Sequence, residues 1–259
     1  MAEPLAVVLR GTTLGPGRPA LCVPLVGRTL HDLVTRASGL PDGVADVVEV
    51  RLDHLTAADD PDRVVAALDA VRAVLPDDVP VLATFRSQAE GGERHLDADA
   101  YRDLLLRVVA AGSADAVDVE QFSRPDVVDT VVEAAHDAGL AVVASSHDFD
   151  ATPAHDEIVS RLLAQQELGA DVVKVAVTPH GAADVLTLLA ATTTFRAGAG
   201  LVPAVTMAMG PLGVVSRLAG ETFGSCLTFG SVGTASAPGQ LDAVALRGVL
   251  DLVHDAQGH

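Results

Sequence analysis

Short apolar segments rich in β-branched residues alternate with longer amphipathic segments, and this alternation constrains the fold more than any other feature of the chain. The pattern is typical of repeated strand–helix units, in which each helix packs on the sheet beside its strand. Eight segments have the character of strands, namely 21–26, 46–52, 79–85, 116–120, 140–145, 171–177, 201–207 and 225–230. Helical periodicity marks 61–75, 98–111, 125–138 and 153–168, and a final helix is expected over 241–253.

Prolines mark the starts of several of these helices. Pro61, Pro125 and Pro153 stand at first helical positions, where a missing N–H leaves no hydrogen bond unmade. Eight units of about 30 residues each predict one domain over residues 1–259, folded as a (β/α)8 barrel. An open doubly wound sheet is the alternative, but no GxGxxG follows the first strand and no GxxxxGK[ST] occurs. Residues 1–20 contain a strand and a glycine-rich turn, which predict a hairpin that closes the barrel floor.

The charge of the chain excludes two classes of partner. Its 35 acidic and 17 basic residues give a formal net charge of −18, whereas nucleic acids and anionic membranes bind basic patches. We expect no signal peptide and no membrane span, because the N-terminal segment and the apolar runs lack the required patterns. Cys22 and Cys226 are too few for a disulfide framework or a zinc site and are expected to be small buried side chains. The expected location is therefore cytoplasmic.

Lys174 is the single lysine among the 17 basic residues, and it stands in the middle of an apolar segment, VVKVAV. On a barrel strand this side chain points into the interior, where burial disfavours the ammonium form and lowers its pKa. A neutral amine attacks carbonyl carbons and forms a Schiff base, which a guanidinium cannot do. The competing interpretation is a structural lysine that pairs with a carboxylate such as Glu49 or Glu120. The avoidance of lysine elsewhere in the chain favours the nucleophile.

Other polar residues at strand ends gather at the same mouth of a barrel. His147 ends the strand before Lys174, and the ordinary pKa of histidine suits proton transfer near neutral pH. Arg51, Arg86 and Arg217 lie on three separate units and predict binding of a small carboxylate. The alternative for each arginine is a pairing with a neighbouring carboxylate. No spacing typical of a metal site links the acidic residues and histidines.

Five segments of the chain resemble the type I 3-dehydroquinate dehydratase family. They are VEVRLDH at 48–54, TFRSQAEGG at 84–92, SSHDF at 145–149, GADVVKVAV at 169–177 and the run MAMGPLGVVSRLAGETFGSCLTFGSVGTASAPGQ at 207–240. The resemblance extends from the first predicted strand to the eighth. It implies a (β/α)8 barrel that forms a homodimer and uses no metal or organic cofactor.

The resemblance also implies a mechanism. Lys174 forms an imine with the C3 ketone of 3-dehydroquinate, His147 acts as general base and acid, and Glu90 is the carboxylate associated with this histidine. Syn loss of water gives 3-dehydroshikimate, a step of the shikimate pathway of aromatic amino acid biosynthesis. The residues that match substrate-binding positions of the family are Glu49, Arg51, Arg86, Arg217, Ser236, Gln240, Met207, Met209 and Phe229. Pro24 stands where some relatives have a serine, and it receives no role.

Two other functions fit part of the sequence. A class I aldolase also forms a Schiff base in a barrel, but it often binds phosphate, and the histidine of SSHDF favours elimination instead. A non-catalytic barrel that binds a carboxylate ligand needs no nucleophilic amine. The presence of Lys174 therefore argues against that function.

Overall fold

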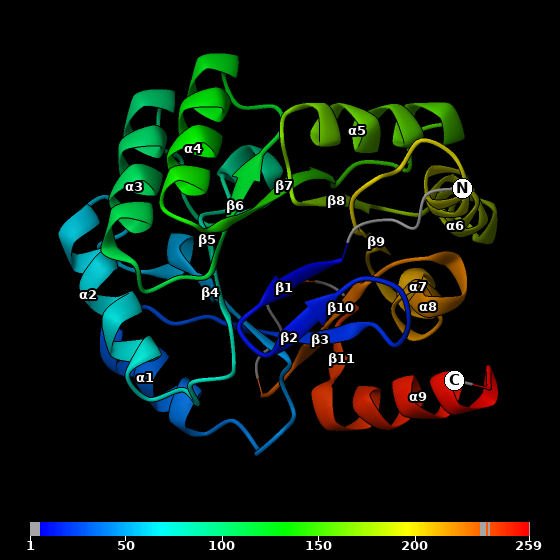
Figure 1. Ribbon diagram of the computed structural model, residues 1–259, viewed down its shortest axis with the longest axis horizontal. Coiled ribbons are helices and arrows are strands. Elements are labelled where there is room, and N and C mark those ends of the chain that lie inside the picture. Colours follow the sequence, from blue (N-terminus) through cyan, green and yellow to red (C-terminus); the bar gives the residue numbers. More distant parts are fainter. Residues whose placement is uncertain (1–5, 234–236, 238, 259) are drawn as a thin grey trace.

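The computed structural model describes residues 6–233, 237 and 239–258. Eight parallel strands form a barrel, and helices surround it (Figure 1). These strands are β3 (Ala20–Leu25), β4 (Val47–Arg51), β5 (Val81–Thr84), β6 (Ala116–Glu120), β7 (Ala141–Asp148), β8 (Val172–Val177), β9 (Ala204–Ala208) and β10 (Leu227–Ser231). β10 pairs with β3, and the ring closes where the Cys226 N–H donates to the Ala204 carbonyl at 2.8 Å. The predicted (β/α)8 barrel is confirmed.

The outer layer consists of long helices with one irregular section. The long helices are α1 (Leu30–Ser38), α2 (Pro61–Arg72), α3 (Ala98–Ala111), α4 (Pro125–Asp137), α5 (His155–Glu167), α6 (Ala182–Ala197) and α9 (Ala243–Ala256). After β9 the chain forms three short segments, η3 (Pro211–Gly213), α7 (Val214–Leu218) and α8 (Gly220–Phe223), in place of one helix. The remaining elements are η1 (Leu52–His54) after β4, η2 (Gln88–Glu90) after β5 and β11 (Leu241–Asp242), which pairs with β10.

Two predicted boundaries are wrong, one because of strand pairing and one because of a helix cap. β7 extends three residues beyond its predicted end, because His147 and Asp148 still pair with Ala176 and Val177 of β8. The last helix begins at Ala243 instead of 241, because the side chain of Asp242 caps it by accepting the Ala245 N–H at 2.9 Å.

An antiparallel hairpin of β1 (Val7–Leu9) and β2 (Thr12–Leu14) lies across the barrel (Figure 1). Leu9 and Leu14 point inward and are buried against the first inward residues of the strands. Their neighbours there are Val47, Leu82, Ala116, Val143, Val172, Val205 and Leu227. The hairpin thus closes the floor as predicted, and burial of each leucine contributes about 1.5–3 kcal/mol.

Three alternate strands, β4, β6 and β8, begin with similar sequences, ADVVE, ADAVD and ADVVK. The three sequences share the pattern ADxV, in which x is any residue. The aspartates Asp46, Asp115 and Asp171 accept backbone N–H groups of the preceding strands, those of Leu21 at 2.7 Å, Val81 at 2.8 Å and Val142 at 2.7 Å. Three residues after each aspartate, Glu49, Asp118 and Lys174 are buried. Because alternate strands of such a barrel contribute to one layer of its interior, these three side chains share a level.

Candidate active site

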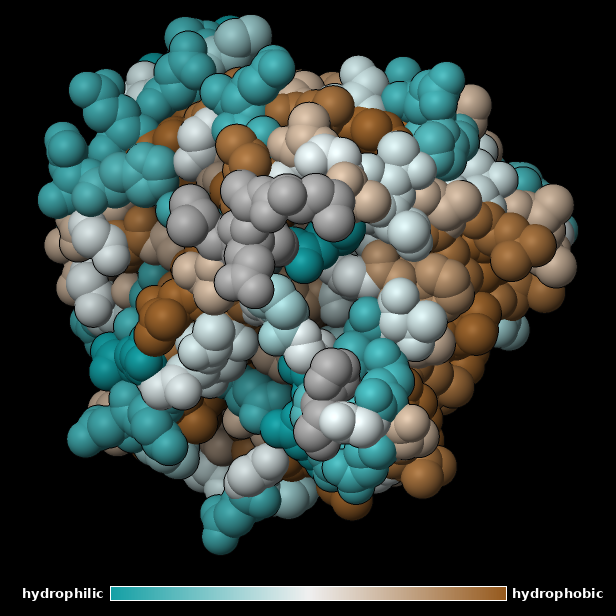
Figure 2. All heavy atoms as spheres, turned by 45° about the vertical axis from the view of Figure 1, so that its right-hand side comes forward, coloured by the Kyte–Doolittle hydropathy of each residue, from teal (hydrophilic) through white to brown (hydrophobic). Residues whose placement is uncertain are grey.

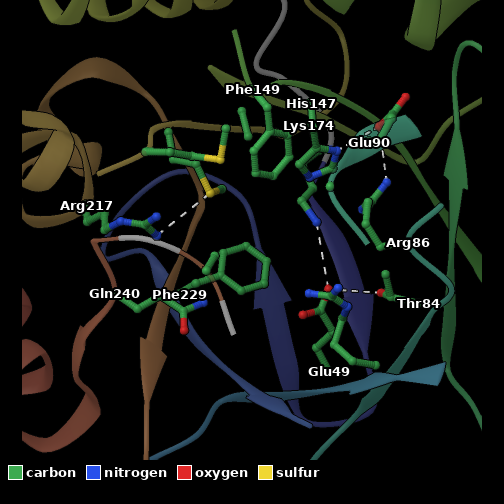
Figure 3. Close-up of a pocket in the computed structure, with 16 residues that line it drawn as sticks. Glu49, Thr84, Arg86, Glu90, His147, Phe149, Lys174, Arg217, Phe229 and Gln240 are labelled. Atoms are coloured by element: carbon green, nitrogen blue, oxygen red, sulfur yellow. Dashed lines mark hydrogen bonds and ion pairs between the residues drawn. The ribbon is translucent and has the colours of Figure 1, made fainter. Parts of the chain in front are cut away.

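A cavity opens among the carboxyl ends of the strands (Figure 3). It brings together nearly all the residues that the sequence predicts for the site. They are Lys174, His147, Glu90, Glu49, Arg51, Arg86, Arg217, Met207, Met209, Phe229 and Gln240. Ser236 lies outside the described residues.

Lys174 lies at the bottom of this cavity, with its amine among two carboxylates and a ring. Its Nζ atom is 3.2 Å from Oδ2 of Asp118 and 3.8 Å from Oε1 of Glu49. The Phe229 ring centroid lies 4.9 Å from Nζ. Of the two carboxylates named in the competing interpretation, Glu49 lies beside the amine, whereas Glu120 accepts from Arg86 and from the Ser87 N–H. The lysine therefore combines burial, an ion pair and direct access to the cavity.

Asp118 is a central residue of the site that the sequence analysis missed. It is fully buried on β6, and it accepts from the Ser145 hydroxyl at 2.6 Å as well as from Lys174. Burial alone would raise the pKa of its carboxyl, but Arg86 and Lys174 outweigh burial and lower that pKa. The recurring ADxV sequence is the signal that places Asp118 at the level of Lys174.

Arg86 links the carboxylates on one wall. Its NH2 donates to both oxygens of Asp118 at 2.9 Å. Its NH1 donates to Glu120 at 2.9 Å, to Ser145 at 3.0 Å and to Glu90 at 3.3 Å. The neighbouring carboxylates raise the pKa of this guanidinium although burial opposes them. With both NH groups directed at protein oxygens, Arg86 organises the acidic wall of the cavity.

Arg51 pairs with Asp53, one of the two possibilities that the sequence left open. Its Nε and NH2 donate to the two oxygens of that carboxylate at 2.9 and 2.8 Å. Asp53 also accepts the backbone N–H groups of Arg86 at 3.3 Å and Glu93 at 3.1 Å. The pair thus ties the loop after β5 to the end of β4, and Arg51 still lines the cavity.

His147 and Glu90 form a hydrogen-bonded pair at the cavity wall, with His147 Nδ1 2.9 Å from Glu90 Oε2. Burial, together with the cations of Arg86, Lys174 and Arg51, holds the pKa of His147 well below its usual value. Burial also raises the pKa of Glu90 to about 8, an effect that Arg86 opposes and the nearby carboxylates increase. Both shifts favour the uncharged forms of the imidazole and of the carboxyl group at neutral pH. Figure 3 shows His147 next to Lys174.

Arg217, on α7, forms the opposite side of the cavity and is 1 % exposed. Its NH1 lies 3.8 Å from the sulfur of Met207, and burial lowers the pKa of the guanidinium to about 10. Met209 and Phe229 add further apolar surface there. A buried guanidinium that lines a cavity is suited to bind an anionic group of a ligand, because its N–H groups form charge-assisted hydrogen bonds with a carboxylate.

The cavity also contains residues that the sequence analysis did not single out. Thr84 donates its hydroxyl to Glu49 at 2.9 Å, which fixes the carboxylate next to Lys174. Gly91 has φ of +81°, and a Cβ at this position would lie 2.2 Å from the Phe149 ring. Only glycine therefore allows Phe149 to cover the loop that carries Glu90. The GG pair at 91–92 is the sequence signal for this contact.

Metal ligation and membrane insertion find no support in the described part of the chain. Among these residues no three His, Cys, Asp or Glu side chains are grouped to hold a metal ion. No described helix is both long and apolar enough to cross a membrane. Cys22 and Cys226 are buried free thiols, as the sequence predicts.

The model of the type I 3-dehydroquinase family matches residues 21–257. The chain belongs to this family. Its relatives include the 3-dehydroquinate dehydratases of Bacillus licheniformis, at 48% identity over 96% of this chain and 97% of that protein, and of Klebsiella pneumoniae, at 44% identity over 96% and 98%.

Solved structures of type I 3-dehydroquinases have the same fold. The Clostridium difficile enzyme, solved with covalently modified comenic acid, superimposes with a TM-score of 0.94 at 42% identity, covering 98% of this chain and 100% of that one. The Geobacillus kaustophilus 3-dehydroquinate dehydratase gives a TM-score of 0.93 at 34% identity, covering 98% of each chain. The type I 3-dehydroquinase fold is therefore preserved through the whole barrel.

Proposed function

We propose that this type I 3-dehydroquinase converts 3-dehydroquinate to 3-dehydroshikimate through an imine on Lys174. The observation that carries the proposal is the placement of the only lysine of the chain, in one cavity with the His147–Glu90 pair and the buried Arg217. An amine, a proton-transfer pair and an anion-binding cation are the groups that this elimination requires.

Turnover begins when the Nζ lone pair of Lys174 attacks C3 of the ketone. The carbinolamine that results loses water and leaves a cationic iminium, which draws electrons from the ring and acidifies the proton on C2. Removal of this proton gives an enamine, whose electrons expel the C1 hydroxyl as water once it is protonated. Attack of a water molecule on the remaining iminium releases 3-dehydroshikimate and restores the amine.

His147 performs the proton transfers. Its lowered pKa leaves an uncharged imidazole, which is the form that accepts the C2 proton. When Nδ1 carries the ring proton and donates it to Oε2 of Glu90, Nε2 has the lone pair that accepts the C2 proton on the substrate side. The imidazolium that forms is stabilised by this carboxyl group and then protonates the leaving hydroxyl.

The carboxylates near Nζ stabilise the iminium. Asp118 at 3.2 Å and Glu49 at 3.8 Å from Nζ face the nitrogen that carries the positive charge of the iminium. Arg217 receives the substrate carboxylate, and the apolar side chains around it strengthen this ion pair by excluding water. Glu49, Arg51, Gln240 and the unplaced Ser236 provide the remaining polar groups that bind the ring hydroxyls.

Borohydride trapping tests the imine. Reduction of the iminium makes a stable secondary amine, so borohydride with 3-dehydroquinate should inactivate the enzyme and add ligand mass to the peptide that contains Lys174. A Lys174→Ala variant should fold, lose turnover and form no adduct. Turnover of the wild-type enzyme without any adduct would exclude the imine mechanism.

We also infer that two copies of the chain associate through an apolar surface, shown in brown on the right of Figure 2. The exposed apolar side chains on α6, η3, α7 and α9 are Leu186, Leu212, Val215, Val244 and Leu252. These elements contact one another, so the side chains belong to one face of the molecule. Apolar surface of this kind is typical of interfaces between subunits.

Sedimentation of matched variants tests the homodimer. Leu186→Arg introduces a charge into the apolar face and should shift the protein towards the monomer. Leu30→Arg changes an exposed leucine of α1 outside that face and should leave the dimer intact. A wild-type protein that sediments as a monomer would contradict the inference.

A cytoplasmic location and a role in the shikimate pathway complete the proposal, and the two free thiols are consistent with a reducing compartment.

A further inference from the structure

A glutamine on the outer layer of the barrel contacts the backbone of Lys174. Gln165 lies on α5, and its exposed fraction is zero. The other buried residues of this helix, Ile158 and Leu162, are apolar and pack on the strands. A polar side chain at such a position loses hydration, so its hydrogen bonds must compensate for that loss.

The amide of Gln165 binds both peptide groups of one residue. Its Oε1 accepts the Lys174 N–H at 2.8 Å, and its Nε2 donates to the Lys174 carbonyl at 3.0 Å. Nε2 also donates to Oε1 of Gln121 at 3.0 Å. A backbone donor and a backbone acceptor fix which end of the amide is oxygen, so its orientation is unambiguous.

These contacts determine where the lysine side chain leaves the strand. The side chain has four rotatable bonds between Cα and Nζ, and Asp118 holds only its free end. Gln165 holds the other end, because it fixes the peptide groups on both sides of the Lys174 Cα. A displacement of about 1 Å at a reacting atom lowers turnover by roughly 100-fold.

We propose that Gln165 is a positioning residue for the amine of Lys174, acting from outside the barrel through the strand backbone. This inference rests on the proposed function, since it concerns the same nucleophile. Gln165 does not line the cavity, so its loss should slow the attack of the amine and leave substrate binding nearly unchanged. A merely structural role would instead lower thermal stability without a selective effect on kcat.

A second glutamine on the same helix supplies a matched control. Gln166 also binds backbone at both ends of its amide, accepting the Leu201 N–H at 2.7 Å and donating to the Ala199 carbonyl at 3.3 Å. Those residues precede β9 and lie outside the cavity lining. Methionine is close to glutamine in size and makes no comparable hydrogen bond, so Gln165→Met and Gln166→Met each remove two side-chain hydrogen bonds to backbone, one pair at Lys174 and one pair outside the site.

The test compares kcat, KM and the rate of borohydride inactivation in wild type and both variants, with 3-dehydroquinate as substrate. For Gln165→Met we expect kcat and the trapping rate to fall at least about tenfold, with KM within about threefold. Gln166→Met should keep kcat within about twofold. Equal kcat in folded Gln165→Met and wild type would overturn the inference. Failure of the proposed function itself would be distinct, because the wild-type enzyme would then form no adduct.

Gln165→Glu decides the question if the methionine variant does not fold. Glutamate keeps the acceptor for the Lys174 N–H, but in its ionised form it has no proton for the Lys174 carbonyl. Its kcat relative to wild type should therefore rise as the pH is lowered and the carboxyl gains a proton. A ratio that stays at one across the pH range would overturn the inference.

Discussion

The amine of Lys174 lies 3.2 Å from a carboxylate oxygen of Asp118, a residue with no exposed surface. Charge attraction in so dry a place is strong, and the lowered pKa of Asp118 shows that the carboxylate persists as an anion. The carboxylate stabilises the positive charge that the lysine nitrogen carries in the iminium. It does not compete as a nucleophile, because Arg86 and Ser145 also bind it.

Asp118→Asn should impair both stability and turnover. The amide keeps the shape of the side chain but removes the buried carboxylate that pairs with both Arg86 and Lys174, a change that costs about 3–5 kcal/mol in unfolding free energy. We expect kcat to fall by about 100-fold, because the iminium loses its nearest anion. Urea unfolding and steady-state kinetics measure the two effects. Asp171→Asn is the control and should retain kcat. It alters a partly exposed aspartate in another copy of the ADxV sequence, the one that precedes Lys174.

The pH dependence of turnover should report the His147–Glu90 pair. The pKa of Glu90 is about 8, so its carboxyl ionises as the pH rises through 8, and an imidazolium beside the anionic carboxylate is a weaker acid towards the leaving hydroxyl. The value of kcat should therefore decline above pH 8. It should not decline around pH 6.5 on the acid side, because the pKa of His147 lies well below that of free histidine.

Glu90→Gln tests this assignment, since glutamine does not ionise and the decline near pH 8 should disappear. The same substitution should change the pH dependence of stability. A raised carboxyl pKa means that the folded state binds more protons than the unfolded state, so this group lowers unfolding free energy as pH rises from about 4.5 towards 8. If kcat of Glu90→Gln still declines above pH 8 as in wild type, the decline must come from the titration of another group.

Arg217→Met should affect binding more than chemistry. Methionine fills similar apolar space next to Met207 but cannot pair with a carboxylate. We expect KM to rise by about 10- to 100-fold, which corresponds to the loss of one buried ion pair in the complex. Steady-state kinetics with wild-type protein as reference measure the change. A KM equal to that of wild type would remove Arg217 from substrate binding.

The hairpin should contribute stability without a role in turnover. Leu14 is 2 % exposed at the barrel floor, and Leu14→Ala should lower unfolding free energy by about 2–5 kcal/mol because it opens a cavity. Val8→Ala, in the same hairpin at 66 % exposure, should change stability by less than about 0.5 kcal/mol. Both variants should keep the wild-type kcat, and loss of activity in folded Leu14→Ala would connect the floor to the site.

Much of the fold can be predicted from the sequence, because local patterns of apolar residues and prolines mark the strand–helix units of the barrel. The apolar strand runs and the helix starts at Pro61 and Pro125 place the units correctly, and the mouth of the barrel follows from their order. The single lysine in an apolar strand indicates the nucleophile for a chemical reason. Boundaries such as the end of β7 depend on pairing between strands, which no local pattern contains.

The contacts among buried charges are harder to predict. Arg86 and Arg51 are both expected at the mouth, yet the structure directs them at carboxylates of the chain itself. Which of several acidic residues contacts Lys174 depends on strand register, and the choice falls on Asp118. Gln165 lies on a helix whose periodicity predicts an apolar position, so only the three-dimensional arrangement reveals its contact with Lys174.

The recurring ADxV sequence has a consequence for how such a barrel acquires its chemistry. Glu49, Asp118 and Lys174 occupy equivalent places on three strands, so the scaffold does not distinguish the positions that carry an acid from the one that carries the amine. If Asp118 and Lys174 exchanged places, the net charge of the layer would stay the same, but the nucleophile would lie on β6 instead of β8. The reaction would then depend on whether a proton-transfer group stands beside the new position, as His147 does beside the present one. In this fold the reaction therefore depends on which strand carries the nucleophile, and the barrel framework does not determine that choice.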